Sequence, residues 1–275
     1  MSDNKLDPPH VQKLKILILT DSRGKGLEEY LQEKLSNCDN ILCTVGVSPG
    51  ARLEELFSQV DNSVGNNEYD YYIICAGICN FTEKVRVGQD LLLQYRPQQG
   101  ALESIIGAIY EFKDRHRHRA NIATIPPASL YNYNFYKNGE TNWMYPVSFD
   151  EVRTQQVQLF SDIERVNNCI VEINTEQGVE TINWAEKTYS TSLKRKRKGS
   201  TPKRKTIFRE KDFQDGVHPT LRLQRVLFGR VYDIITKTAL HRDIEEPTPV
   251  EPAVSTEEEE EVDDSWNFKR RRVHY

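Results

Sequence analysis

Short apolar runs alternate with amphipathic segments over most of this chain. The apolar runs are rich in Ile, Leu, Val, Tyr and Cys, a composition typical of buried β-strands. In the segments between them, apolar residues recur every three or four positions, which is the spacing of one face of a helix. The predicted strands are 14–20, 40–47, 69–77, 120–125 and 178–184.

The amphipathic segments give the predicted helices. Four of them are 24–35, 51–60, 101–117 and 218–240, and a further helix begins at the Ser148–Glu151 capping box. Strands that are separated by helices pair in parallel through right-handed crossovers, so the pattern predicts an α/β fold of one domain, a three-layer α/β/α sandwich. By analogy with other open parallel sheets, we expect a flavodoxin-like, five-stranded sheet of order 2-1-3-4-5.

Charge is strongly segregated along the chain, although the net charge is only −4. We expect residues 14–240 to form the domain, with an N-terminal extension at 1–13 and a basic insertion at 191–211. Residues 241–275 are an acidic tail with a basic end. This tail is expected to be disordered because its composition cannot bury enough apolar surface to fold.

Several classes of protein find no support in the sequence. No apolar run is long enough for a membrane span, and the first residues lack a signal pattern, so an intracellular protein is expected. The five cysteines form no Cys-x-x-Cys pair, which favours reduced core residues over a zinc site. The first strand is followed by neither a Walker loop nor a Gly-x-Gly-x-x-Gly turn, and no metal or organic cofactor is expected.

Chemically useful residues follow the predicted strands, at the sheet edge where α/β proteins bind ligands. Ser22 follows the first strand, Gly50 the second and Asn80 the third, while Asp215 lies three residues before His218 near the end of the domain. Acyl transfer requires a serine, an imidazole base, a carboxylate that orients the base, and donors for the oxyanion. The sequence contains each of these parts.

Each of these residues also has a purely structural interpretation. Asp21-Ser22 between a strand and a helix is a common N-cap, and Gly50 after proline is a common turn. Arg23 is a candidate for binding an acidic substrate group, but we expect it to be exposed to solvent. The Tyr- and Asn-rich tract 130–149 is either a lid or pocket wall, or an ordinary surface loop.

The order of these residues resembles the four sequence blocks of the SGNH/GDSL hydrolase family: Ser22 in TDSRG, Gly50 in SPGA, Asn80 in AGICN, and Asp215 with His218 in DGVHP. The resemblance implies a flavodoxin-like esterase fold with Ser22 as nucleophile, His218 as base and Asp215 as its partner. It also implies that Ser22, Gly50 and Asn80 donate to the oxyanion. The Asp-Ser-Arg-Gly form further resembles esterase domains of some eukaryotic mobile elements.

The sequence departs from the family pattern at two places. Thr20 stands where the family usually has the glycine of Gly-Asp-Ser, which predicts less space around the nucleophile. The third block usually reads Gly-x-Asn-Asp, whereas here Asn80 comes one place later and Cys79 takes the expected position. Asn80 is therefore either a donor in a shifted register or an ordinary loop residue.

Two hypotheses of function follow. The first is a serine carboxylester hydrolase that acts on an ester substrate through an acyl-enzyme. The second is a catalytically inactive SGNH-like module that binds RNA or DNA through a basic surface. The tract KRKRKGSTPKRK at 194–205 suits either phosphate contacts or a nuclear import receptor, so we expect the nucleus rather than the cytoplasm.

Overall fold

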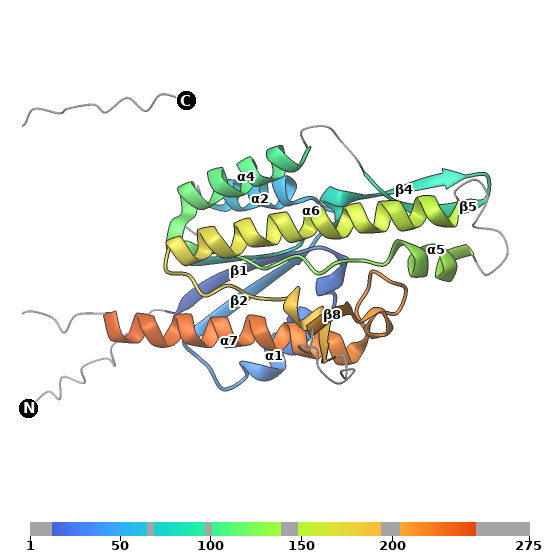
Figure 1. Cartoon of the computed structure of the whole chain (residues 1–275). Coiled ribbons are helices and arrows are strands. Elements are labelled where there is room, and N and C mark those ends of the chain that lie inside the picture. The colour runs from blue at the N-terminus through green and yellow to red at the C-terminus, as the bar shows by residue number, and fades with distance from the viewer. Residues whose placement is uncertain (1–12, 65–68, 97–100, 139–147, 194–203, 246–275) are drawn as a thin grey trace, which may run out of the picture.

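The computed structural model describes residues 13–64, 69–96, 101–138, 148–193 and 204–245. At its centre lies a parallel sheet of four strands in the order β2-β1-β3-β6 (Figure 1). The strands of this sheet are β1 (Leu14–Thr20), β2 (Ile41–Val47), β3 (Tyr71–Cys75) and β6 (Ala120–Ile122). This is the predicted order for the first four strands, and the predicted bounds of the first strand are confirmed.

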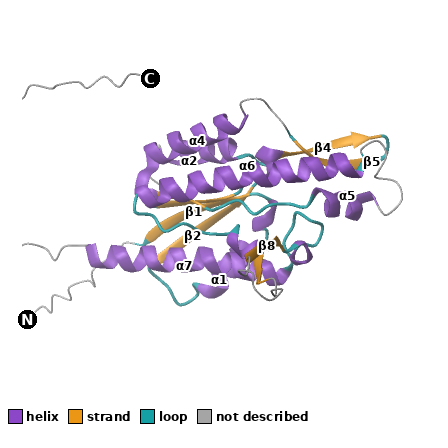
Figure 2. Cartoon of the chain, viewed as in Figure 1, coloured by secondary structure: helices purple, strands orange, loops and turns teal. Residues whose placement is uncertain are grey.

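Helices cover both faces of the sheet, so the fold has three layers (Figures 1 and 2). The helices on one face are α2 (Leu53–Val64), α4 (Ala101–His116) and α6 (Phe149–Glu176). Those on the other face are α1 (Leu27–Lys34) and α7 (Leu221–Glu245). The predicted cap of α6 is confirmed, because the Ser148 hydroxyl accepts a hydrogen bond from the backbone N–H of Glu151.

The two cores of the molecule meet at β1. Side chains alternate along a strand, so Leu17 and Leu19 pack into one helical layer while Ile16 and Ile18 pack into the other. All four are buried. Because burial of such a side chain stabilises the fold by about 1.5–3 kcal/mol, this strand is held firmly from both sides.

The predicted fifth strand, 178–184, is wrong. Its apolar residues Ile182 and Trp184 are buried as expected, but the segment has no strand pairing with β6. Instead, Asn121 and Thr124 bind its backbone through their side chains: Asn121 Nδ2 donates to Glu180 O, and Thr124 Oγ1 accepts from the N–H of Ala185. Because β6 ends at Ile122, only one backbone bond, from Thr124 N to Ile182 O, joins the two segments.

Two antiparallel hairpins were not predicted. One is formed by β4 (Thr82–Val87) and β5 (Asp90–Tyr95), and the other by β7 (Tyr189–Leu193) and β8 (Arg204–Phe208). The second hairpin joins the two ends of the predicted basic insertion. Most of the basic tract, 194–203, lies outside the described residues, as does the predicted tail beyond Glu245, where α7 ends.

The tract at 130–149 begins with helix α5 (Leu130–Asn138), which covers the edge of β5. Asn134 binds both the N–H and the C=O of Leu93, and Asn138, one turn later, does the same for Leu91. The two asparagines thus take the place of a neighbouring strand. Residues 139–147 lie outside the described residues.

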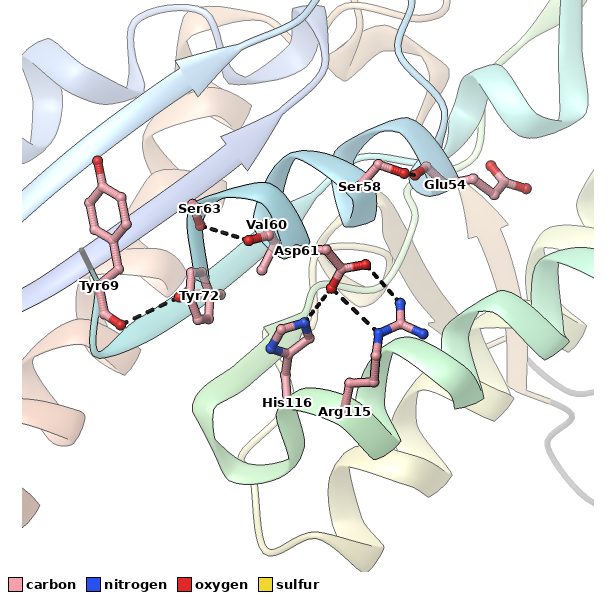
Figure 3. A network of polar contacts seen from close by, with 9 residues as sticks. All are labelled: Glu54, Ser58, Val60, Asp61, Ser63, Tyr69, Tyr72, Arg115 and His116. Carbon is pink, nitrogen blue, oxygen red and sulfur yellow. Dashed lines mark hydrogen bonds and ion pairs between the residues drawn. The ribbon is translucent and has the colours of Figure 1, made fainter. Parts of the chain in front are cut away.

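A polar network joins α2 to α4 (Figure 3). Arg115 donates to both carboxylate oxygens of Asp61, and His116 Nε2 lies 2.8 Å from Asp61 Oδ1. Beside it, the rings of Phe57 and Phe112 stack with centroids 4.2 Å apart. This contact fixes α2, whose N-terminal end lies at the site described next. None of the helices in the described ranges is long and apolar enough to cross a membrane.

Candidate active site

Ser22 lies directly after the carboxyl end of β1, in a 3₁₀ turn of residues Ser22–Gly24. The residue that caps this turn is Asp21, because its Oδ1 accepts a hydrogen bond from the N–H of Arg23 at 2.9 Å. The Ser22 hydroxyl therefore does not serve as the cap. Instead, Ser22 Oγ lies 3.1 Å from Nε2 of His218, a residue 196 positions later in the chain.

Thr20 and Gly24 form a tight pair beneath the nucleophile. The Thr20 hydroxyl donates to Cys75 O at 2.8 Å, which ties the end of β1 to the end of β3. A Cβ atom on Gly24 would lie 2.2 Å from Thr20 Cγ2, far inside van der Waals contact. The sequence predicted less space around the nucleophile, whereas the close contact of Thr20 is with Gly24, where only a glycine leaves room for the threonine side chain.

His218 is oriented by Asp215 within one short loop. Asp215 Oδ2 lies 2.8 Å from His218 Nδ1, while its Oδ1 accepts from the backbone N–H groups of Val217 and His218. Burial raises the pKa of Asp215, but these hydrogen bonds together lower it further, to about 2. Asp215 is consequently ionised at neutral pH and can hold a proton on Nδ1.

Gly216 anchors this loop against α5. Its φ of +84° is a left-handed conformation that favours glycine, and a Cβ atom there would lie 2.5 Å from the carbonyl oxygen of Ser129. The Ser129 N–H in turn donates to Gly216 O at 2.8 Å. The position of His218 thus depends on the N-terminal end of α5.

These contacts join a hydroxyl, an imidazole and a carboxylate in one relay. Ser22 is half-buried, and His218 and Asp215 lie successively behind it. The order of atoms, Oγ to Nε2 and Nδ1 to Oδ2, is the arrangement in which an imidazole takes a proton from a serine. The three residues predicted to be catalytic are therefore linked through His218, which lies within hydrogen-bonding distance of both Ser22 and Asp215.

The relay opens into a cavity of about 560 Å³. This volume lies within the range of small-molecule sites, roughly 300–1,000 Å³. Gly50, a predicted oxyanion donor, belongs to the cavity wall, and Tyr133 makes α5 a pocket wall, one of the two alternatives for its tract. The lining residues are Ser22, Pro49, Gly50, Arg52, Ile78, Cys79, Thr82, Glu83, Lys84, Leu93, Arg96, Tyr133, Val217 and His218.

Asn80 departs from its predicted position. It lies in the short helix α3 (Ile78–Phe81) and is buried, but it does not line the cavity. Its Oδ1 accepts from the N–H of Leu53 at 2.9 Å, and its Nδ2 donates to Glu54 Oε2 at 2.7 Å. The amide is turned toward the N-terminus of α2, and Cys79 takes the place at the cavity wall.

Arg23 is buried, so the expectation of solvent exposure is wrong. Only 2% of the side chain is accessible, and Nη1 donates to Pro126 O at 2.7 Å. Burial lowers the pKa of the guanidinium, and the charges of Asp21 and Asp215 act in the opposite direction. Arg23 is therefore a buried residue bound to the Pro126 carbonyl, and it does not line the cavity.

Three basic residues of the cavity were not predicted from the sequence. Arg52 precedes α2, Lys84 lies on β4, and Arg96 follows β5. The two last positions depend on the β4–β5 hairpin, for which the sequence did hold evidence. Polar and apolar residues alternate from Lys84 to Val87, and Gly88, with φ of +64°, starts a two-residue turn.

The fold has counterparts among solved structures. A lipase/acylhydrolase from Enterococcus faecalis aligns with a TM-score of 0.50 and 13% identity, over 82% of this chain and 96% of that one. A GDSL-like lipase from Bacteroides thetaiotaomicron aligns with a TM-score of 0.51 and 12% identity, over 82% and 88%. The chain therefore has the fold of GDSL-type lipases and acylhydrolases. Neither a protein-family model nor a curated protein sequence matches it.

No group of three or more His, Cys, Asp or Glu side chains within the described segments is arranged to hold a metal ion. The cysteines there are all free thiols. Cys75 and Cys169 are buried, as predicted for core residues, while Cys38, Cys43 and Cys79 are partly exposed.

Proposed function

We propose that this protein is a serine carboxylester hydrolase of the SGNH type. The observation that carries the proposal is the continuous relay, in which Ser22 Oγ lies 3.1 Å from His218 Nε2 and His218 Nδ1 lies 2.8 Å from Asp215 Oδ2. A serine that serves only as a helix cap needs no imidazole beside it. The cap here is Asp21, which leaves the hydroxyl of Ser22 for chemistry.

The reaction proceeds in two stages. Ser22 Oγ attacks the carbonyl carbon of the ester while His218 Nε2 accepts the hydroxyl proton. His218 then returns this proton to the leaving alcohol, and the acyl group stays on Ser22. In the second stage, His218 takes a proton from water, whose oxygen attacks the acyl carbon. His218 then returns this proton to Ser22 Oγ as the acid is released. Throughout, Asp215 keeps the other proton on Nδ1 and stabilises the imidazolium.

The oxyanion needs hydrogen-bond donors at the cavity wall, each typically worth about 3–4 kcal/mol in the transition state. We assign this role to the backbone N–H groups of Ser22 and Gly50, which both belong to lining residues. Asn80 acts indirectly in this scheme. By accepting from Leu53 N, the first N–H of α2, its amide fixes the helix end that follows Gly50.

Labelling with a fluorophosphonate probe tests the proposal. The wild-type protein should be labelled covalently, Ser22→Ala should not be labelled, and His218→Ala should be labelled far more slowly. Ser58→Ala is the matched control, because Ser58 is an exposed serine whose hydroxyl bonds only to its own helix, at Glu54 O. It should be labelled like the wild type.

An unlabelled wild-type protein that is folded by circular dichroism would contradict the proposal. In that case the inactive module that binds RNA or DNA becomes the better hypothesis. That hypothesis predicts that the logarithm of the binding constant for a nucleic acid falls linearly with the logarithm of the salt concentration, because contacts with phosphates release counterions.

A further inference from the structure

Three cationic side chains gather around the cavity beside Ser22. Arg52, Lys84 and Arg96 belong to its lining, and they come from three separate segments of the chain. The acidic side chains of the lining amount to one, Glu83. A cavity with walls mainly of one sign of charge raises the local concentration of ligands of the opposite sign.

Lys84 is directed to the cavity by the pairing of its hairpin. It lies opposite Leu93 in the β4–β5 register, and both residues line the cavity together with Thr82, two positions before Lys84. Glu83, the residue between them, also belongs to the lining, so one carboxylate shares this part of the wall with the Lys84 ammonium. The Lys84 ammonium stands 5.9 Å from the ring centroid of Tyr133, a further lining residue.

Arg52 and Lys84 are not neutralised by neighbouring carboxylates. Neither forms an ion pair with any residue in the described parts of the chain. Their charges reach into the cavity wall: burial and Asp21 raise the pKa of the Cys79 thiol, whereas the charges of Arg23, Lys84 and Arg52 act to lower it. Cys79 and Ser22 both line this cavity, so the same charges act on the space that a substrate would occupy.

We infer that the substrate is an ester that carries a negatively charged group, a carboxylate or a phosphate, recognised by Arg52, Lys84 and Arg96. This inference rests on the proposed function for its chemistry. The anion need not be buried. Guanidinium groups bind planar or tetrahedral oxyanions through paired N–H donors, and the ammonium adds a flexible point charge.

Matched esters test the inference by catalysis. The alcohol side is probed with 4-acetoxybenzoate, 4-acetoxyphenyl phosphate and the neutral methyl 4-acetoxybenzoate. The acyl side is probed with the mono-4-nitrophenyl ester of adipic acid and with 4-nitrophenyl hexanoate. Each kcat/KM is divided by the rate constant of hydroxide-catalysed hydrolysis, which removes the intrinsic reactivity of the ester. At low salt, we expect the normalised kcat/KM of at least one anionic ester to be ~10-fold higher than that of its neutral counterpart. This preference should shrink as added salt screens the charges.

Variants then locate the preference. Lys84→Gln should reduce the ratio of anionic to neutral kcat/KM about threefold, because a single exposed charge contact contributes modestly. Lys84→Glu should reverse the preference, because it places a negative charge in the same part of the wall. The matched control is Lys34→Gln. Lys34 is also exposed and also lies 5.9 Å from a tyrosine ring centroid, but on α1, outside the cavity lining. It should leave the ratio unchanged.

Binding separates this inference from the proposed function. The Ser22→Ala variant is titrated with 4-acetamidobenzoate and with its methyl ester, two amide analogues that differ only in charge, and binding is followed by NMR shifts at the cavity. Tighter binding of the anion, lost in Ser22→Ala combined with Lys84→Glu, supports the inference even if no ester is hydrolysed. Equal or absent binding of both analogues overturns it. Ser22-dependent hydrolysis without preference for anionic esters also overturns it, while the proposed function stands.

Discussion

Replacement of Asp215 by asparagine tests the relay at its most buried member. The carboxylate accepts three hydrogen bonds, two from backbone N–H groups at Oδ1 and one from His218 Nδ1 at Oδ2. In Asp215→Asn, the amide oxygen can keep the two backbone bonds, since it is also an acceptor. The amide nitrogen, however, is a donor and cannot accept from Nδ1, so it favours the histidine tautomer whose proton is on Nε2.

Two magnitudes follow from this exchange. A His218 that carries its proton on Nε2 cannot take the proton of Ser22, and the corresponding exchange in a serine protease lowers kcat by ~10⁴. The second magnitude is the loss in the free energy of unfolding. The pKa of Asp215 is lowered from 3.8 to about 2, and at 1.36 kcal/mol per unit this is worth roughly 2 kcal/mol at neutral pH. The contribution is fully present above pH ~4 and disappears as the pH falls through 2.

The assay therefore has two readouts. Ester turnover should fall at least 10³-fold in Asp215→Asn, and the difference in unfolding free energy from the wild type should be near 2 kcal/mol at pH 6 and close to zero at pH 2. Asp39→Asn, at an exposed carboxylate outside the site, is the control for both. Turnover of Asp215→Asn within tenfold of the wild type would refute the assigned role of Asp215. A stability difference independent of pH would refute the reasoning about its charge.

Four further outcomes are expected. Gly24→Ala should lower both turnover and melting temperature, and Thr20→Gly in the same chain should restore them, because the added methyl group competes for the space of the threonine. Asn80→Ala should lose ~1–3 kcal/mol of stability through unpaired polar groups at the start of α2, and a stable variant with unaltered turnover would exclude its positioning role. Asp61→Asn should lose ~1 kcal/mol in urea unfolding with unchanged turnover, since its network lies in the α2–α4 contact. Glutamine at every Lys and Arg of 194–205 should disperse the protein from the nucleus or weaken nucleic-acid binding, and it should not change hydrolysis of a small ester.

Most of the central layer could be predicted from sequence because three of its strands, β1, β3 and β6, are buried on both faces. Such strands are continuous apolar runs, and helices of clear period separate them, so the order β2-β1-β3-β6 and the helical layers were accessible. The segment 178–184 shows the limit of this reasoning. Its apolar residues do enter the core, but strand pairing depends on backbone partners, and the side chains of Asn121 and Thr124 take those partners instead. The hydrophobic pattern of a segment predicts whether its side chains are buried, but it does not predict whether its backbone pairs with a neighbouring strand.

The candidate site divides in the same way. Ser22, Asp215 and His218 were accessible because strand ends and one short loop determine them locally. The cationic wall was not predicted. Local sequence indicates the β4–β5 hairpin that carries Lys84 and precedes Arg96, but the placement of that hairpin depends on asparagines of α5, which cover its free edge. The contact between α5 and β5 joins segments that lie about 40 residues apart in the sequence, so no local sequence pattern predicts it.

The third block illustrates how one position can change while the geometry around it is kept. The first N–H groups of a helix lack partners within the helix, so a buried helix start needs an acceptor from elsewhere. Asn80 supplies that acceptor to Leu53 at the start of α2, and it holds Glu54 of the same turn through Nδ2. Since Gly50, with φ of +84°, lies just before this turn, the amide of Asn80 limits the movement of the Gly50 backbone.

A donor role for the neighbouring cavity-wall position would then fall on Cys79, whose thiol is a weak donor. Catalysis should accordingly depend on the backbone N–H groups of Ser22 and Gly50, and on Asn80 chiefly through the position of Gly50.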